Sequence, residues 1–469
     1  MSNKKISKRQ WINFSIWAII IISFTAWMGN WWLLIGLLIL VDIYLTKFIP
    51  WGAWKKSKNP KIQNILNWID DILFALIFVY LINIFIFQNY QIPSSSLEKT
   101  LLVGDYLFVS KLSFGPRVPN APIAFPLVQN TLPILNCKSY IEWPNWGYKR
   151  VKGLGHVKRN DIVVFNFPAG DTVAINMPNP DYYSIINRHG YESVRLNKAT
   201  FGDIVYRPVD KRDNYVKRCV GMPGDSLKIV GNQIYIDGQI LKDAKNVQYV
   251  YYVETDGTRI TDELFRRLQV SKDDRMLMTE NNENFGSLSF LGFTRNNEGH
   301  YNPVYRLPLT TEALEMIKKI SSIRKVVLEP EAFGGEVYPI NYNLNWSRDN
   351  YGPIWIPKKG ATITLDEKNL AIYNRCIRNY ENNTLEISPN GSVKINGQPA
   401  TTYTFKYDYY WMMGDNRHNS ADSRSWGFVP EDHVVGKPIL VWLSLDKDKG
   451  LFDGGIRWNR MFRMVDSFN

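Results

Sequence analysis

Three apolar runs open the chain, at 12–28, 31–46 and 66–87. A helix that crosses a bilayer needs about 20 apolar residues, or about 17 at the short end. The third run has this length, whereas the first two are short, are joined by Gly29-Asn30, and the second contains Asp42. The sequence therefore predicts a crossing at 66–87, preceded either by two more crossings or by a shallow interfacial hairpin.

Both alternatives give the same orientation. Positions 4–9 are rich in Lys and Arg, and two crossings or none leave the basic segment 47–61 on their side of the membrane. The positive-inside rule makes that side cytoplasmic, so the third run exports everything after Phe87. A cleavable signal peptide is the competing interpretation, but no small-x-small site follows the first run. We therefore expect a multi-pass anchor, up to three helices within 1–90, in the cytoplasmic membrane.

After Phe87 the pattern changes to short β-branched or aromatic runs interrupted by Gly, Asn and Asp, as in DIVVFNF at 161–167. IYIDGQ at 234–239 and VKINGQ at 393–398 have the form of hairpin arms. Helical spacing occurs at about 311–322 and more weakly at 261–268. These features predict a mostly β protein with a few surface helices.

Two segments carry candidate chemistry, Ile92-Pro93-Ser94-Ser95-Ser96 and Tyr215-Val216-Lys217-Arg218. A serine hydroxyl is a weak nucleophile, and a neutral lysine amine can take its proton if the lysine pKa is lowered. Lowering that pKa from about 10.4 to about 7 requires about 4 to 5 kcal/mol, which an apolar pocket supplies by desolvation. The alternative is a lysine with its amine in water and a serine that caps a turn.

Four segments, taken in order, resemble bacterial type I signal peptidases. They are QIPSSSLEKTLLVGDYLFVSK at 91–111, NDIVVFNFP at 160–168, YVKRCVGMPGD at 215–225 and GDNRHNSADSRSWGFVP at 414–430. The resemblance covers the last membrane segment and the β-rich core. It implies a membrane-bound serine endopeptidase, with its catalytic domain on the extracytoplasmic side, that removes signal peptides from exported preproteins through an acyl-enzyme.

The resemblance also implies residue roles. Ser96 is the expected nucleophile, Lys217 the general base, and the Ser94 hydroxyl with the Ser96 N–H the oxyanion hole; Ser95 receives no role. The residues expected to orient the base and to brace the site are Ser420, which would hydrogen-bond the Lys217 amine, and the pairs Asp415–Arg218 and Asp422–Arg424. Candidates for pockets that accept small side chains are Tyr90, Ile92, Pro93, Tyr215 and Val216, although plain core packing explains them equally well.

Two positions depart from the family pattern. Leu97 follows the nucleophile where methionine is usual, and His418 stands where an acidic residue is common. Leucine keeps the volume and apolarity of methionine, so we expect altered packing and not inactivity. Because His418 replaces an acidic residue, the sequence does not determine the charge balance near Lys217.

The implied organisation is a signal-peptidase-like, β-rich catalytic domain at 91–231 and 403–450, with an insertion near 112–158. An accessory α+β lobe occupies 232–402 and a tail 451–469. The lobe has no motif that indicates its function. The aromatic residues of the insertion are expected to pack beneath a loop, with contact to lipid as the alternative.

Composition restricts the class of protein and the kinds of ligand that remain possible. A chain of 469 residues with 45% apolar content is not disordered, and its net charge of +12 comes without a nucleic-acid-binding signature, so lipid headgroups are the expected counter-charge. Three scattered cysteines and the absence of an HExxH pattern predict no metal, and no cofactor is expected. The rivals are a catalytically silent membrane scaffold, and a self-cleaving regulator that should carry a DNA-binding module in place of the anchor.

Overall fold

The computed structural model describes residues 6–56, 59–283, 285–297, 299–340, 342, 344–389, 391–450 and 453–468. The chain forms two compact units. The first comprises Met1–Phe87 and Lys111–Gly155, and the second comprises Gln88–Ser110 and His156–Asn469.

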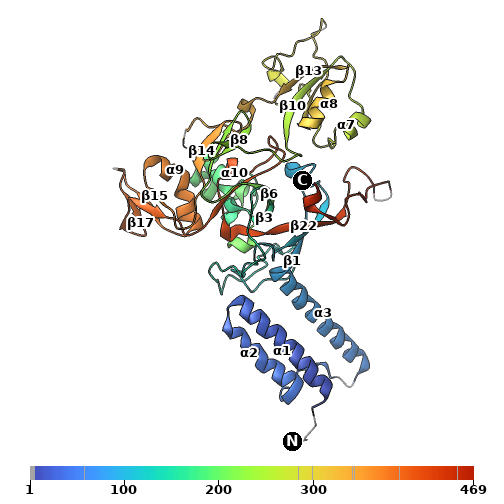
Figure 1. The fold of residues 1–469 in the computed structure, drawn as a ribbon, viewed down its shortest axis with the longest axis vertical. Coiled ribbons are helices and arrows are strands. Elements are labelled where there is room, and N and C mark those ends of the chain that lie inside the picture. Colours follow the sequence, from blue (N-terminus) through green and yellow to red (C-terminus); the bar gives the residue numbers. More distant parts are fainter. Residues whose placement is uncertain are drawn as a thin grey trace. The chain divides into compact units, whose positions relative to one another are not determined.

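The first unit contains the apolar helices (Figure 1). They are α1 (Lys8–Met28), α2 (Ile35–Val41), which is flanked by helical turns at Trp31–Leu34 and Asp42–Thr46, and α3 (Pro60–Phe85), which a turn at Ala53–Lys55 precedes. Ser7 begins α1 with a capping box, and Gly29 ends it in the left-handed region at φ 60°. Asn59 caps α3 and Pro60 occupies its first turn, where a missing N–H costs nothing.

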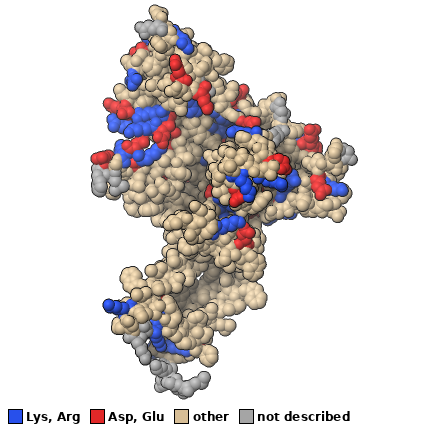
Figure 2. Space-filling view, turned by 180° about the vertical axis from the view of Figure 1, so that it is seen from behind, with Lys and Arg blue, Asp and Glu red and all other residues tan. Residues whose placement is uncertain are grey.

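By length and composition, α1 and α3 are the two helices within the described residues that can cross a membrane. The expected helices at 12–28 and 66–87 are thus present, and α1 begins earlier than its apolar run. The apolar helix Trp31–Thr46 is shorter, so the choice between two crossings and a shallow interfacial hairpin stays open for the first two runs together. In Figure 2, most of the visible face of these helices carries neither acidic nor basic side chains.

The segment 111–155 belongs to the same unit and has no named helix or strand. The Trp27 indole donates to the Lys152 carbonyl at 3.0 Å, and the Tyr80 hydroxyl donates to the Pro122 carbonyl at 2.8 Å. Its Trp143 side chain is 79% exposed. Other apolar side chains of this segment are exposed as well: Phe125, Leu127, Ile134, Leu135 and Ile141. The expectation that the aromatic residues pack beneath a loop holds for the buried Phe114 and Tyr140 but is wrong for the exposed Phe125, Trp143 and Trp146. An exposed apolar surface of this kind is typical of an interaction face.

An eight-stranded sheet positions the candidate site in the second unit. Its order is β1-β2-β22-β3-β6-β20-β21, with β23 beside β22 (Figure 1). The strands are β1 (Phe87–Gln91), β2 (Asp105–Ser110), β3 (Ile162–Asn166), β6 (Asn214–Gly221), β20 (Tyr409–Met413), β21 (Val429–Pro430), β22 (Val434–Ser444) and β23 (Arg463–Met464). β3 is buried throughout, and Ile162 and Val164 join the core cluster with Leu97, Leu107 and Val441.

The remaining elements of this unit form smaller sheets and helices. One sheet has the order β14-β7-β8-β9, with β7 (Ser226–Val230), β8 (Gln233–Ile236), β9 (Gln239–Ile240) and β14 (Tyr351–Trp355). Another has the order β11-β12-β10-β13, with β10 (Gln248–Thr255), β11 (Met276–Leu277), β12 (Val304–Thr310) and β13 (Ile323–Leu328). The other strands are β4 (Thr172–Ala174), β5 (Ile204–Tyr206), β15 (Thr362–Thr364), β16 (Leu385–Ile387), β17 (Val393–Ile395), β18 (Gln398–Pro399) and β19 (Thr402–Thr404). The helices are α4 (Tyr182–His189), α5 (Tyr191–Leu196), α6 (Lys198–Phe201), α7 (Asp262–Arg267), α8 (Thr311–Lys318), α9 (Glu367–Arg375) and α10 (Ser423–Trp426).

The mostly β class is confirmed, as are the helices expected near 261–268 and 311–322 and the hairpins at 234–239 and 393–398. Helices α4 to α6, α9 and α10 were not expected from the sequence. The division of this unit at 232 and 402 stays a prediction, because β7 and β8 pair across the first boundary. Side chains from β14 and α9 also share one core cluster with Trp411 and Phe428.

Candidate active site

The turn after β1 presents the candidate nucleophile. The buried Ile92 fixes its entry, because the Ile92 N–H donates to the Asp105 carbonyl at 2.9 Å and the Ile92 carbonyl accepts from Gly104 at 3.0 Å. A helical turn at Ser95–Leu97 follows, in which the Ser96 side chain is buried.

Strand β6 brings the candidate base to this turn. Lys217 lies at the middle of the sheet, opposite Val163 of β3, and is 3% exposed. Its Nζ atom is 2.6 Å from Ser96 Oγ, so the two side chains are in hydrogen-bond contact although 121 positions separate them. This is the geometry required of a nucleophile and its base.

Burial sets the protonation of this lysine. Desolvation lowers the pKa of Lys217 to about 8, and the carboxylates of Asp422 and Asp415 act in the opposite direction. The Tyr215 ring centroid is 5.9 Å from the amine. Because the desolvation exceeds the attraction of both carboxylates, the neutral amine is favoured far more than in an ordinary lysine.

Two buried ion pairs stand beside the lysine. Arg218 Nε and Nη2 donate to the two oxygens of Asp415 at 2.8 and 2.7 Å, while Arg424 holds Asp422 in the same way at 2.9 and 2.8 Å. The Gly414 N–H donates to Asp422 at 3.1 Å. The structure therefore contains both pairings that the sequence suggested, and each neutralises a carboxylate that would otherwise raise the lysine pKa further.

Ser420 lies next to the site, but its hydroxyl donates to the Ala421 carbonyl at 3.4 Å. Among the described residues no hydrogen bond joins it to Lys217. A Cβ atom on Gly414 would lie 2.3 Å from Ser420 Oγ and 2.6 Å from the Ser96 carbonyl oxygen, so only glycine fits between these groups. The base-orienting role of Ser420 stays a prediction.

The two expected oxyanion donors are available. In the described part of the chain, neither the exposed Ser94 hydroxyl nor the Ser96 N–H donates a hydrogen bond to another group. Unused donors next to a nucleophile are what an oxyanion hole needs before substrate binds.

The expected pocket residues separate into two groups. Ile92 is buried in the core cluster against which Tyr90 and Val216 pack, and Ile92 and Pro93 line a cavity of about 380 Å³. Tyr215 instead stacks on Phe167, with ring centroids 4.5 Å apart, and contacts Trp426. Their role in substrate binding stays a prediction.

The two departures from the family pattern have structural explanations. Leu97 is 1% exposed and fills the core cluster. The buried His418 contacts other groups: Val250 N donates to its Nδ1 at 3.4 Å, and its Nε2 is 3.3 Å from Asp349. Burial lowers the pKa of His418, opposed by its bond to Asp349. A neutral imidazole between these groups accounts for both contacts.

Sequence reasoning missed several residues that contact the site. Thr100 donates to Asp415 at 2.8 Å, and the Asn416 N–H donates to the Ser96 carbonyl at 3.1 Å. Gln248 and Asp274, from the region between β6 and β20, contact the segment 415–417 and Ser95. Asn416 and Thr100 lie within the four recognised segments, whereas Gln248 and Asp274 lie in sequence that carries no motif.

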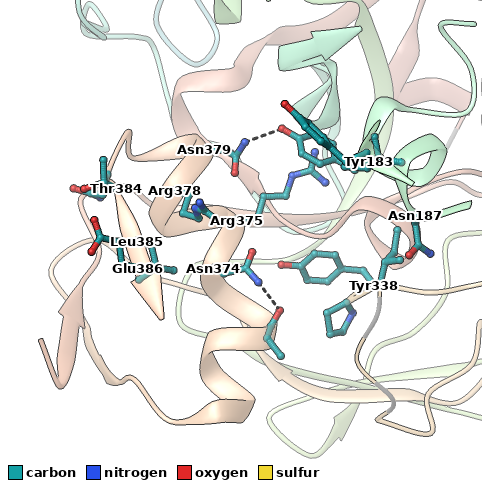
Figure 3. Close-up of a pocket in the computed structure, with 16 residues that line it drawn as sticks. Tyr183, Asn187, Tyr338, Asn374, Arg375, Arg378, Asn379, Thr384, Leu385 and Glu386 are labelled. Atoms are coloured by element: carbon teal, nitrogen blue, oxygen red, sulfur yellow. Dashed lines mark hydrogen bonds between the residues drawn. The ribbon is translucent and has the colours of Figure 1, made fainter. Parts of the chain in front are cut away.

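A second cavity, of about 960 Å³, lies between α4 and α9 and contains neither Ser96 nor Lys217 (Figure 3). Its Asn379 amide donates to the Tyr183 hydroxyl at 2.7 Å. The Arg375 guanidinium lies 3.9 Å from the Tyr183 ring centroid, and its Nε and Nη2 atoms are covered. A guanidinium stacked on an aromatic ring in this way stabilises the wall of the cavity. Within the described residues no group of three or more His, Cys, Asp or Glu could hold a metal ion.

Comparison with known proteins identifies the family. The family model for "Signal peptidase, peptidase S26" matches residues 65–287 and 356–443. The chain belongs to this family. The gap in the match, 288–355, contains β12, α8 and β13 of the accessory region.

Individual relatives agree with this assignment. Signal peptidase I of Buchnera aphidicola subsp. Baizongia pistaciae is 23% identical over 419 residues, which is 88% of this chain and 88% of that protein. Signal peptidase I of Haemophilus influenzae is 23% identical over 417 residues, covering 88% of this chain and 79% of that protein. That of Helicobacter pylori J99 is 34% identical, over 16% of this chain and 29% of its own length. The resemblance seen in the four segments is therefore confirmed, and the S26 peptidase makes up most of the chain.

Proposed function

We propose that this protein removes signal peptides from exported preproteins as a membrane-bound serine endopeptidase with a Ser-Lys dyad. The observation that carries the proposal is the 2.6 Å contact between the buried Lys217 amine and the Ser96 hydroxyl. Membership of a signal peptidase family supports the substrate class.

The reaction proceeds in two halves. Lys217 takes the hydroxyl proton as Ser96 Oγ attacks the scissile carbonyl, and the Ser94 hydroxyl and Ser96 N–H stabilise the oxyanion. The protonated Lys217 then gives its proton to the leaving amine of the mature protein, which leaves the signal peptide esterified to Ser96. Water attacks this ester while Lys217 again takes a proton, and the returning proton restores the Ser96 hydroxyl as the signal peptide departs.

A bilayer anchor fits this substrate. α1 and α3 have the length and apolarity of spanning helices, and the exposed apolar side chains of 111–155 belong to the same unit. When the first two apolar runs make two crossings or none, the basic residues at 4–9 and 47–61 share one side of the membrane, which favours a cytoplasmic N-terminus and an extracytoplasmic catalytic part. Ser96 follows Phe87 by nine positions, so an extended link spans about 30 Å at most. A substrate tethered by its own apolar signal presents its cleavage site at a similar height, which raises the effective concentration.

Mutation of the dyad tests the reaction. The purified protein in lipid vesicles should cleave a preprotein, and Ser96→Ala and Lys217→Ala should each abolish cleavage. Lys228, an exposed lysine of β7, and Ser193, an exposed serine of α5, provide matched controls whose alanine variants should cleave normally. Cleavage by either dyad variant would exclude the assignment, and a folded wild-type protein that cleaves nothing would favour the silent scaffold.

Orientation has a separate test. Cys219 and Cys376 are buried, whereas Cys137 is exposed. In a Cys137→Ser background, a cysteine introduced by Ser193→Cys should react with a membrane-impermeant maleimide in intact spheroplasts. Labelling that requires membrane lysis would contradict the extracytoplasmic placement.

A further inference from the structure

The accessory region joins the candidate site through a backbone contact. The Gln248 N–H, at the start of β10, donates to the Asp415 carbonyl at 2.9 Å, and the Gln248 carbonyl accepts from Arg417 at 2.9 Å. This makes a parallel bridge between Gln248 and Asn416. Gln248 is fully buried, and Asp243 pairs with Arg417 at 2.9 Å beside it. The short segment that carries Asp415 is thus held by the accessory region.

Asn416 connects this contact to the turn at Ser95–Leu97, which carries Ser96. Its N–H donates to the Ser96 carbonyl at 3.1 Å, and its side-chain amide donates to the Ser95 carbonyl at 3.3 Å. The Ser95 carbonyl and the Ser96 N–H belong to one planar peptide group. A bond that fixes this carbonyl therefore also fixes the direction of the N–H that faces the developing oxyanion.

A second contact reaches the turn directly. The Ser95 hydroxyl donates to Asp274 Oδ1 at 2.9 Å, and the Ser271 hydroxyl donates to Asp274 Oδ2 at 2.8 Å. Asp274 is half-buried, stands just before β11, and is oriented by Ser271. Ser271 and Asp274 both come from the accessory region, so one side of the nucleophile turn is held from outside the catalytic strands.

The turn that carries Ser96 has few bonds of its own. The Glu98 N–H donates to the Ser95 carbonyl at 3.0 Å, and the Thr100 and Leu101 N–H groups donate to the Leu97 carbonyl at 3.1 and 2.8 Å. A single short helical turn gains little from such bonds, because fixing its dihedral angles costs more than the first bond returns. The contacts from Asn416 and Asp274 therefore add to what holds Ser96 Oγ at its distance from Lys217.

We propose that the accessory region positions the nucleophile for catalysis, with Asp274 acting through Ser95 and Gln248 acting through Asn416. This inference rests on the proposed Ser-Lys peptidase function. Both residues are positioning residues: neither touches the reacting atoms, and each orients the peptide group that carries the oxyanion donor. Because that donor is used in the transition state, loss of the Asp274 contact should lower kcat and leave KM nearly unchanged.

The test is a double-mutant cycle on Ser95→Ala and Asp274→Ala, with preprotein cleavage by the full-length protein in vesicles. Each single variant should lower kcat about tenfold, as expected for losing one hydrogen bond to a charged group, with KM within about twofold. The double variant should be no slower than the slower single variant, because both substitutions remove the same contact. Asp274→Asn keeps an acceptor and should recover part of the rate.

Controls separate this inference from the reaction itself. Asp273→Asn changes the exposed neighbour, which pairs with Lys447, and should cleave normally. Effects that multiply in the double variant, or unchanged kcat in both single variants, would overturn the inference while Ser96→Ala remains inactive. Cleavage by Ser96→Ala would instead overturn the proposed function. If Asp274→Ala does not fold, the kcat of Ser95→Ala alone tests the inference. This substitution removes a single oxygen atom, and its kcat is measured on protein whose unfolding midpoint is unchanged.

Discussion

The pH dependence of cleavage follows from the burial of Lys217. Its pKa is lowered from an ordinary value of 10.5 to about 8, so its environment favours the neutral amine by about 3 kcal/mol. At pH 7 the neutral fraction is then about one-tenth, compared with about one in 3,000 for an unperturbed lysine. At pH 7 the neutral fraction of Lys217 is thus about 300 times larger than that of an unperturbed lysine.

The assay is kcat/KM for a fluorogenic preprotein-derived peptide from pH 5.5 to 10. Since the free enzyme must hold a neutral lysine, kcat/KM should rise tenfold per pH unit below pH 8 and level off above it. Lys217→Arg, which stays charged throughout, should be inactive at every pH. A midpoint near or above pH 10 would show that burial does not perturb the amine. A midpoint near pH 6 would indicate a histidine, and a flat profile would exclude an ionising base.

The same burial has an energetic cost for the fold. Between pH 8 and 10.5 the unfolded chain binds the Lys217 proton more tightly than the folded chain does, so stability rises with pH across this window. Below pH 8 the full cost of about 3 kcal/mol is present. Lys217→Met should therefore abolish cleavage and raise the free energy of unfolding at pH 7 more than at pH 10.5. Equal effects at both pH values would contradict the assignment of the shift to folding.

Three further substitutions test the surroundings of the dyad. Ser94→Ala should lower kcat about a hundredfold, as for other oxyanion-hole donors, while unchanged kcat would remove this hydroxyl from the mechanism. Gly414→Ala should destabilise the protein by about 1 to 3 kcal/mol through overpacking, whereas Gly286→Ala, which meets open space, should change denaturant unfolding by about 0.5 kcal/mol or less; equal effects would contradict the close approach. Burial raises the pKa of Glu98 to about 7. The free energy of unfolding therefore falls as pH rises from 4.5 to 7, because across this range the unfolded chain loses the Glu98 proton while the folded protein keeps it. Glu98→Gln should then stabilise the protein by about 3 kcal/mol at pH 8 but not at pH 4, and a gain at both values would exclude a titrating carboxyl.

The contact between Ser96 and Lys217 could be predicted because both residues stand in segments that resemble those of type I signal peptidases. Ser96 stands in a short segment next to an apolar run, and Lys217 stands among β-branched and aromatic neighbours of one strand. The pairings of Asp415 with Arg218 and of Asp422 with Arg424 were also suggested, since the residues occur within motifs of known order. Their functional roles remain predictions until the kinetic tests are made.

The rest depended on contacts between distant segments that carry no motif. Gln248 bonds through its backbone, so its side-chain type contains no signal for the contact. Asp274 lies 179 positions from Ser95 and is one of two adjacent acidic residues in its loop. The orientation of His418 toward Asp349 was hidden for the same reason, because only folding brings Asp349 next to it.

The position of the accessory region explains how it can reach the site. The chain leaves the main sheet at the end of β6 and returns at β20, and these two strands are neighbours, with Cys219 opposite Met412. Because the two ends of the inserted segment lie side by side, the insertion leaves the sheet intact. The entropic cost of closing a loop grows only slowly with loop length, so a long insertion is tolerated. The same arrangement places both ends of the insertion beside Lys217 and the segment 414–420. A region inserted at this point can therefore grow without disturbing the dyad, and the start of its strand β10 already lies against the segment 415–417 that contacts the turn carrying Ser96.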